Sequence, residues 1–133
     1  MFSSLSTRAP IFLSILRIVS ALTFMAHGIQ KLFNFPPGEH GPVENWLSFP
    51  MGVAGLLETF GGALLLIGLF TRPVAFILSG MMGVAYWTAH APQSPFPVIN
   101  QGDAAILFCF TFLYLFFAGP GPLSVDGLLS KKA

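Results

Sequence analysis

The chain has 133 residues, of which 54% are hydrophobic and only 8% are charged. Soluble globular domains carry about 25% charged residues, so this composition indicates a membrane protein and excludes an ordinary soluble domain. The formal net charge of +1, with no cluster of basic residues, excludes a nucleic-acid-binding surface. The single cysteine, Cys109, excludes an internal disulfide and a Cys-x-x-Cys redox pair.

Four apolar segments are expected to cross the bilayer as helices, because about 20 apolar residues span a hydrocarbon core of about 30 Å. They cover approximately residues 10–33, 51–70, 73–91 and 103–118. The first follows Arg8 as in a secretory signal, but Arg17 interrupts its apolar run, so we interpret it as a retained transmembrane helix. The segments predict an all-α, integral membrane four-helix bundle that forms a single domain over residues 1–133.

The connections predict how the helices are oriented. Thr71 and Arg72 precede Pro73 in a tight turn, so the second and third helices are expected to form an antiparallel hairpin. One side of the membrane then receives Arg8, Arg72, Lys131 and Lys132, and the other receives Lys31, Glu39 and Glu44. The positive-inside rule places both termini in the cytoplasm and the two long polar loops on the outer face.

Each predicted helix carries one stripe of polar or small residues at helical spacing, which is expected to face the other helices. The stripes contain Ser14, Arg17, Ser20, Phe24, His27 and Lys31 in the first helix, Gly55, Glu58 and Gly62 in the second, Ser79, Gly83, Tyr86 and His90 in the third, and Asp103, Leu107, Phe110 and Tyr114 in the fourth. The polar groups of the stripes concentrate toward the outer ends of the helices, where they predict an outward-facing polar cavity.

The candidate catalytic residues of this cavity are His27, Glu58, His90 and Asp103, and the candidate ligand-binding residues are Arg17, Lys31, Tyr86 and Asn100. Intramembrane charges are costly and usually paired or functional. A structural role is open for each: Arg17 and Glu58 can fix helix register, Lys31 can reach the interface, and Asp103 can cap its helix. No two candidate ligands have metal-binding spacing within one helix, so we expect no metal site.

Several stretches of the chain, taken in order from residue 16 to residue 126, resemble the DoxX family of small bacterial membrane proteins. They are LRI, HGIQKLF, GLLETFGGALLLIGLFTRPVA, AYWTAH, FPVINQGDAAILF and FLYLFFAGPGPLSVD. The family's motif residues match Arg17, His27 to Phe33, Glu58 with Gly61 and Gly62, His90, and Asn100 to Asp103. The last motif reads Asn-Gln-Gly-Asp here, whereas the family more often has Asn-Gly-Gly-Glu, so the acidic side chain of Asp103 is shorter by one methylene group.

This resemblance implies a multi-pass protein of the bacterial inner membrane that is linked to redox chemistry, as in thiosulfate–quinone oxidoreductase and quinol oxidase systems. We therefore expect a subunit that binds a quinone or quinol, that has no intrinsic cofactor of its own, and that exchanges electrons with a redox partner protein. Two alternatives stay open: a non-catalytic accessory subunit, and a pathway for protons or small solutes in a homo-oligomer.

Overall fold

The computed structural model describes residues 3–132, and within them every regular element is helical, with no strand. The long segments are α2 (Ala9–Phe33), α3–η1–α4 (Met51–Leu56, Leu57–Gly61 and Gly62–Ile67), α5–η2 (Thr71–Ala85 and Tyr86–His90) and α7 (Asp103–Ala118). Short helices are α1 (Ser3–Ser6), α6 (Pro97–Asn100) and α8 (Val125–Ser130). Within the described residues, α2 is the helix that is both long and apolar enough to cross a membrane unaided, and Met51–Ile67 and Asp103–Ala118 are shorter apolar helices.

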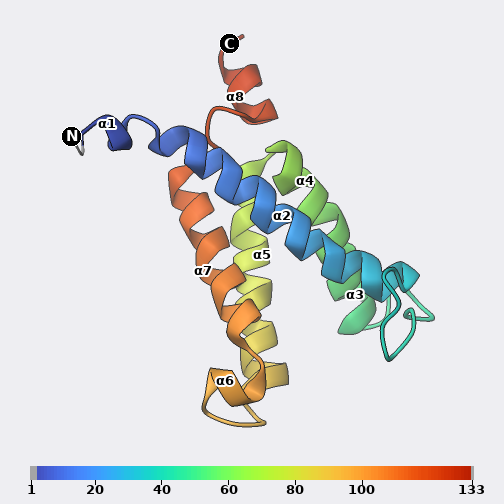
Figure 1. The fold of residues 1–133 in the computed structure, drawn as a ribbon. Coiled ribbons are helices and arrows are strands. Elements are labelled where there is room, and N and C mark those ends of the chain that lie inside the picture. The colour runs from blue at the N-terminus through green and yellow to red at the C-terminus, as the bar shows by residue number, and fades with distance from the viewer. Residues whose placement is uncertain (1–2, 133) are drawn as a thin grey trace.

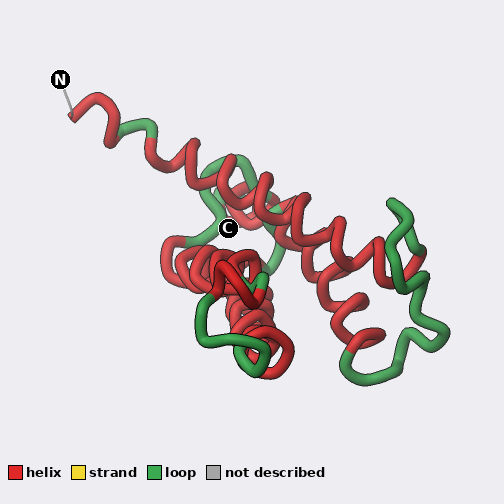
Figure 2. Tube along the Cα trace, turned by 60° about the horizontal axis from the view of Figure 1, so that its bottom comes forward, coloured by secondary structure: helices red, strands yellow, loops and turns green. Residues whose placement is uncertain are grey.

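The long segments form two antiparallel pairs that diverge from one end of the molecule (Figure 1). Helix α2 packs along α3, η1 and α4, while α5 packs along α7, and contacts between the pairs are fewer. Figure 2 shows the α5–α7 pair and the α2–α4 pair as separate arms. The molecule is therefore more open than the bundle expected from the sequence. We call the end where α4 turns into α5 the closed end, and the opposite end, with loop 34–50 and α6, the open end.

Glycines bring α2 into close contact with the segment that it packs against. A Cβ atom added at Gly28 would lie 2.6 Å from the backbone nitrogen of Thr59 and 2.8 Å from the Cβ of Glu58. A Cβ at Gly62 would lie 3.0 Å from that of Met25. Small residues of this kind let helix backbones approach where lipid supplies no hydrophobic drive for helix association. The glycine stripe of the second predicted helix is therefore a packing surface.

Aromatic rings join the two pairs halfway along their length. Phe24 of α2 meets Phe108 and Phe112 of α7 edge to face, with ring centroids 5.2 Å and 4.9 Å apart. Such pairs add about 0.5–1.5 kcal/mol each to the free energy gained by burial. Further buried residues surround these rings, namely Ala21, Leu65, Ala75, Leu78, Met82 and Leu115.

Arg17 holds the closed end together although its side chain is fully buried. Its Nη1 donates to the carbonyl oxygens of Leu65 (2.6 Å) and Leu66 (2.8 Å) at the end of α4. Its Nε donates to the Pro120 carbonyl (2.9 Å), and Nη2 donates to that of Leu123. The last carbonyls of a helix lack intrahelical partners, so the guanidinium satisfies groups that burial would otherwise leave costly. Arg17 thus ties α2 to α4 and to the segment that follows α7.

Asp126 of α8 completes the closed end by capping α5. Its carboxylate accepts hydrogen bonds of 2.9 Å from the backbone N–H groups of Phe70 and Thr71, where α5 begins. Its own backbone N–H donates to the Gly68 carbonyl at 2.9 Å. Gly68 has a φ of +70°, and an added Cβ would lie 2.7 Å from Nη1 of Arg17. The α4–α5 turn therefore requires glycine for both its backbone conformation and its closeness to the guanidinium.

We predict that Arg17→Met lowers the melting temperature strongly and Arg17→Lys less so. The methionine leaves several buried carbonyls without hydrogen-bond donors, which lowers the free energy of unfolding by about 1–3 kcal/mol for each carbonyl. The ammonium of a lysine replaces some of the N–H donors of the guanidinium. Thermal unfolding followed by circular dichroism in detergent measures the effect. Arg8→Met, at an exposed position, is the control; an equal effect of Arg8→Met and Arg17→Met would contradict the role assigned to Arg17.

The Asp126 cap predicts a pH dependence of stability. Burial raises the pKa of this carboxyl. Hydrogen bonds from Thr71 and Phe70 and the charge of Arg17 lower the pKa by more than burial raises it, so it falls below its ordinary value of 3.8. A carboxyl whose pKa is lower in the folded state stabilises the fold when the pH is above the pKa of the unfolded state. This stabilisation is lost as the pH falls through the pKa of the folded state. We expect Asp126→Asn to lower the melting temperature at neutral pH, and we expect this difference to shrink only as the pH falls below 3.8 and through the lower folded-state pKa. A difference independent of pH would refute this.

Candidate functional site

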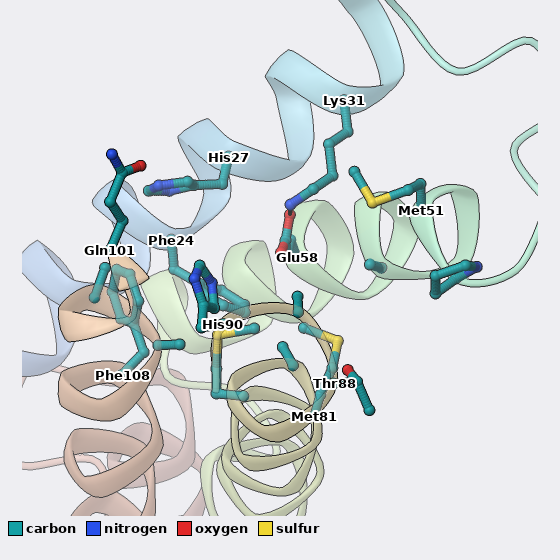
Figure 3. A pocket seen from close by; sticks show the side chains of 17 residues that line it. Phe24, His27, Lys31, Met51, Glu58, Met81, Thr88, His90, Gln101 and Phe108 are labelled. Carbon is teal, nitrogen blue, oxygen red and sulfur yellow. Dashed lines mark hydrogen bonds and ion pairs between the residues drawn. The ribbon is translucent and has the colours of Figure 1, made fainter. Parts of the chain in front are cut away.

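A cavity of about 380 Å³ lies between the two helix pairs toward the open end (Figure 3). We call it the inner cavity. Its walls are mainly apolar, with Phe24, Met81, Met82 and Phe108 among them, and its polar side chains are His27, Lys31, Glu58, Thr88, His90 and Gln101. Small-molecule sites commonly have volumes of about 300–1,000 Å³, apolar walls and a few placed polar groups. The inner cavity is therefore the candidate functional site.

Lys31 and Glu58 form an ion pair across one wall of the inner cavity. The ammonium of Lys31 lies 2.5 Å from Oε2 of Glu58, and Figure 3 shows the lysine reaching from α2 to the acid. The Glu58 side chain is 5% exposed and that of Lys31 is 22% exposed. A buried carboxylate needs such a partner, because its desolvation is otherwise very costly. Gly28 allows the pairing, since it lets α2 approach the backbone next to Glu58.

Two π-helical turns position candidate residues. Glu58 lies in η1 (Leu57–Gly61), and His90 ends η2 (Tyr86–His90). A π-turn adds a residue to the helical turn and rotates the side chains that follow, and such turns are frequent at functional sites. Because of η2, the third predicted stripe does not share one face: Ser79 donates to the Cys109 carbonyl at 2.8 Å, against α7, while His90 lines the cavity.

Each cavity histidine is held by a main-chain carbonyl. Nδ1 of His27 lies 2.9 Å from the Thr23 carbonyl oxygen, and the ring packs edge to face on Phe108 at 6.0 Å. Nδ1 of His90 lies 2.9 Å from the carbonyl oxygen of Asn100, and its ring stacks on Tyr86 at 6.4 Å. These contacts fix the two rings and leave each Nε2 without a partner among the hydrogen bonds of the described residues.

Asn100 and Tyr86 shape the loop behind His90 and do not line the inner cavity. The buried Asn100 side chain donates to the Ser94 carbonyl (2.8 Å) and accepts from the Gly102 backbone N–H (2.8 Å). Its amide also donates weakly to the Tyr86 hydroxyl at 3.4 Å. Both residues therefore position this loop, and the backbone carbonyl of Asn100 holds the His90 ring. Their direct contact with a ligand stays a prediction.

Two more predicted site residues lie away from the inner cavity. Arg17 binds carbonyls at the closed end and does not pair with Glu58. Asp103 is exposed, and the prediction that it caps α7 is wrong: Gly102 is the N-cap residue and Asp103 is the first helical residue. No side chain caps the start of α7, and Asp103 contributes there as an acidic residue in the first turn, where the helix dipole favours a negative charge.

The sequence did not indicate some of the cavity residues. Thr88, Gln101 and the apolar walls Met81 and Phe108 were missed. Met81 and Phe108 look like ordinary lipid-facing or core residues in an apolar segment. Gln101 could have been noticed, since it lies between Asn100 and Gly102 in a polar loop motif.

A second cavity, of about 480 Å³, adjoins the inner cavity on the loop side. We call it the loop cavity. It is lined by Gln30 and by loop residues 38–43, and it shares His27, Lys31 and Met51 with the inner cavity. The loop is attached by a 2.8 Å hydrogen bond from the Val43 backbone N–H to the Lys31 carbonyl. His27 and Lys31 thus lie at the boundary between the inner cavity and the loop cavity, whose wall is the more polar of the two.

The chain is similar to several bacterial proteins. A protein of Haemophilus influenzae described as uncharacterised is 40% identical over 98% of this chain and 99% of its own length. An uncharacterised membrane protein of Mycobacterium tuberculosis is 28% identical, covering 89% of this chain and 81% of its own. The inner membrane protein YphA of Escherichia coli is also 28% identical, over 88% and 89% of the two chains. No solved structure matches the chain significantly.

These relatives and the apolar helices define a helical membrane protein. The DoxX family model matches residues 12–91, which include most of α2 and all of η1 and η2, and the chain belongs to the DoxX family. The family resemblance seen in the sequence is therefore confirmed.

We predict that Lys31→Met destabilises the protein more than the double substitution Lys31→Met with Glu58→Met. The single change leaves Glu58 buried without its partner, at a cost of about 3–5 kcal/mol, whereas the double change replaces the pair by apolar side chains. Melting temperatures in detergent, with Lys132→Met as an exposed control, measure this coupling. Additive losses in the double variant would show that the pair is not energetically coupled.

Proposed function

We propose that the protein is a multi-pass protein of the bacterial inner membrane, with α2, α3–η1–α4, α5–η2 and α7 as its transmembrane segments. The Escherichia coli relative is named an inner membrane protein, which supports this location. Both termini are then cytoplasmic, because Arg8, Arg72, Lys131 and Lys132 gather on the closed side. The inner cavity opens toward the outer half of the membrane.

The function that we propose is the binding of a quinone or quinol in the inner cavity, within a membrane oxidoreductase system. One observation carries this proposal: the Lys31–Glu58 pair and two imidazoles line an otherwise apolar cavity between diverging helix pairs. Apolar and aromatic walls suit a planar ring and its lipid-soluble tail, and the polar groups suit its oxygen atoms. The residues present therefore fit such a ligand.

The protein's own groups perform three tasks in this proposal. Phe24 and Phe108 contact the ring and exclude water, and Lys31 holds Glu58 in place. Glu58 and the imidazoles of His27 and His90 are candidate proton carriers, since carboxylates and histidines are common general acids and bases. The wall that the two cavities share at His27 connects these groups with the loop cavity. A bound quinone would supply the redox chemistry, and a partner protein would exchange electrons with it.

A second candidate function is that of a non-catalytic accessory subunit. A groove between the α3–η1–α4 segment and α5 favours it, since its lining is entirely apolar and includes Leu56, Phe60, Leu64 and Ile77. A transmembrane helix of a partner could pack there, close to Gly61.

The two functions are separated by mass spectrometry of quinones and lipids that remain bound to the detergent-purified protein. We expect a stoichiometric quinone in wild type and in Asp103→Asn, whose side chain lies outside the cavity, and its loss in His27→Ala and Glu58→Gln. Melting temperatures establish that the variants are folded. A folded wild type that carries no quinone, and that takes up none when it is added, would favour the accessory function.

A further inference from the structure

The groove between the α3–η1–α4 segment and α5 has a volume of about 410 Å³ and lies on the side of the inner cavity toward the closed end. We call it the apolar groove. Every residue that lines it is apolar, including Leu57, Leu64 and Leu78. The side chains of Phe60 and Ile77, which also line it, are 59% and 56% exposed, so the groove is open at the molecular surface. Its occupant must therefore be apolar.

The apolar groove continues the inner cavity along the same interface between helical segments. On α5, Leu78 lines the groove and Met82, one turn later, lines the cavity. On η1, Leu57 lines the groove and the next residue, Glu58, lines the cavity. Residues three or four apart are neighbours on the surface of a helix, so the two spaces adjoin at the level of η1.

The two spaces differ as the two parts of a lipid-soluble quinone differ. The inner cavity carries an ion pair and two imidazoles, whereas the apolar groove carries no polar side chain. The 380 Å³ of the inner cavity lies near the lower end of the range for small-molecule sites, so a substituted ring takes up much of it. A long tail must then leave the cavity, and the adjoining groove offers it an apolar path.

We infer that the apolar groove binds the hydrocarbon tail of the ligand whose head group lies in the inner cavity. This inference rests on the proposed function and assigns its ligand class, an amphiphile with a ring-sized polar head and one long tail. The tail leaves the cavity between Leu57 and Leu78 and follows α4 toward the closed end as far as Leu64, over about 10 Å. Because lipid is apolar too, dispersion contacts with the lining, rather than escape from water, stabilise the tail there.

The lining of the apolar groove favours a hydrocarbon chain over a transmembrane helix of a partner. Helix contacts in membranes are rich in small and hydrogen-bonding residues. The glycine of the groove, Gly61, is covered by its own chain, since an added Cβ atom would lie 3.0 Å from Cδ2 of Leu78. The other lining residues are leucine, isoleucine, valine and phenylalanine. A hydrocarbon tail suits this lining because it needs neither a close backbone approach nor a hydrogen bond.

The first test compares two probes that share one head group: decylubiquinone, and the same dimethoxy-methyl-benzoquinone without a tail. Binding to the full chain in detergent is measured by titration calorimetry. Leu64→Trp and Ile77→Trp fill the groove, and we expect each to weaken decylubiquinone binding about tenfold, since overpacking an apolar space has an effect of that size. The tail-less probe is expected to keep its affinity within about twofold, because neither residue lines the inner cavity.

Val84→Trp is the matched control for these substitutions. Val84 is 62% exposed on the same helix as Ile77, and it lines neither the apolar groove nor the inner cavity. We expect this variant to bind both probes as the wild type does. Thermal unfolding in detergent establishes that each tryptophan variant is folded.

A second test locates the tail directly. A decylubiquinone analogue with a photoreactive diazirine near the end of its tail is crosslinked to the wild type, and the labelled residues are identified by mass spectrometry. We expect labels within residues 56–64 and 74–78 that disappear when excess decylubiquinone is added. Labels that arise from unspecific contact with the apolar surface are not removed by this competition.

The outcomes distinguish this inference from the function on which it rests. Unchanged decylubiquinone binding in both groove variants, or competed labels on another surface only, would overturn the inference and leave the head-group site in place. The groove would then be left to a partner helix or to a second copy of the chain. Failure of both probes to bind folded wild type would overturn the proposed function itself.

Discussion

The rest of the structure depends on the hydrogen bonds that the buried guanidinium of Arg17 donates to main-chain carbonyls. The guanidinium is surrounded by carbonyl oxygens from the end of α4 and from the segment after α7, so elements distant in sequence meet at one side chain. A charge within a membrane segment is tolerated only when its donors are satisfied, and here they are satisfied by the main chain. The helix pairs are therefore fixed firmly at the closed end, and they diverge from it toward the open end.

That divergence creates the inner cavity, and the packing of each pair determines its walls. Gly28 and Gly62 keep α2 close to η1 and α4, so Lys31 meets Glu58. The rings of Phe24, Phe108 and Phe112 pack between the two pairs, and those of Phe24 and Phe108 form part of the cavity wall. The site is thus a consequence of joining two well-packed helix pairs at one end and separating them at the other.

Much of this architecture could be predicted from the sequence, because apolar length and helix-breaking residues are local signals. The long helical segments start and end close to the expected positions, and His27, Lys31, Glu58 and His90 were expected to share one cavity. The expectation was based on helical spacing, which η1 and η2 alter. No local signal marks a π-turn, since it forms through packing with neighbouring elements.

The errors arise where a residue's partner is far away in sequence. Arg17 finds carbonyls that lie up to 106 positions along the chain, which no spacing rule could indicate. Asp103 looks like an N-cap, but the hydrogen bond between Asn100 and Gly102 sets the start of α7. The sequence identifies residues that cannot be idle in a membrane. Tertiary contacts decide which of them support the fold and which line the cavity.

The positions of the two tryptophans have a spectroscopic consequence. Trp46 lies in the loop after α2 against Phe33, and Trp87 lies in η2 against Tyr86, so both indoles belong to the open end. Residues 3–132 include no tryptophan at the closed end. Indole emission therefore reports the surroundings of the cavity, whereas circular dichroism reports all helices together. Any difference between the two signals during heating would show that the two ends of the molecule lose their structure separately.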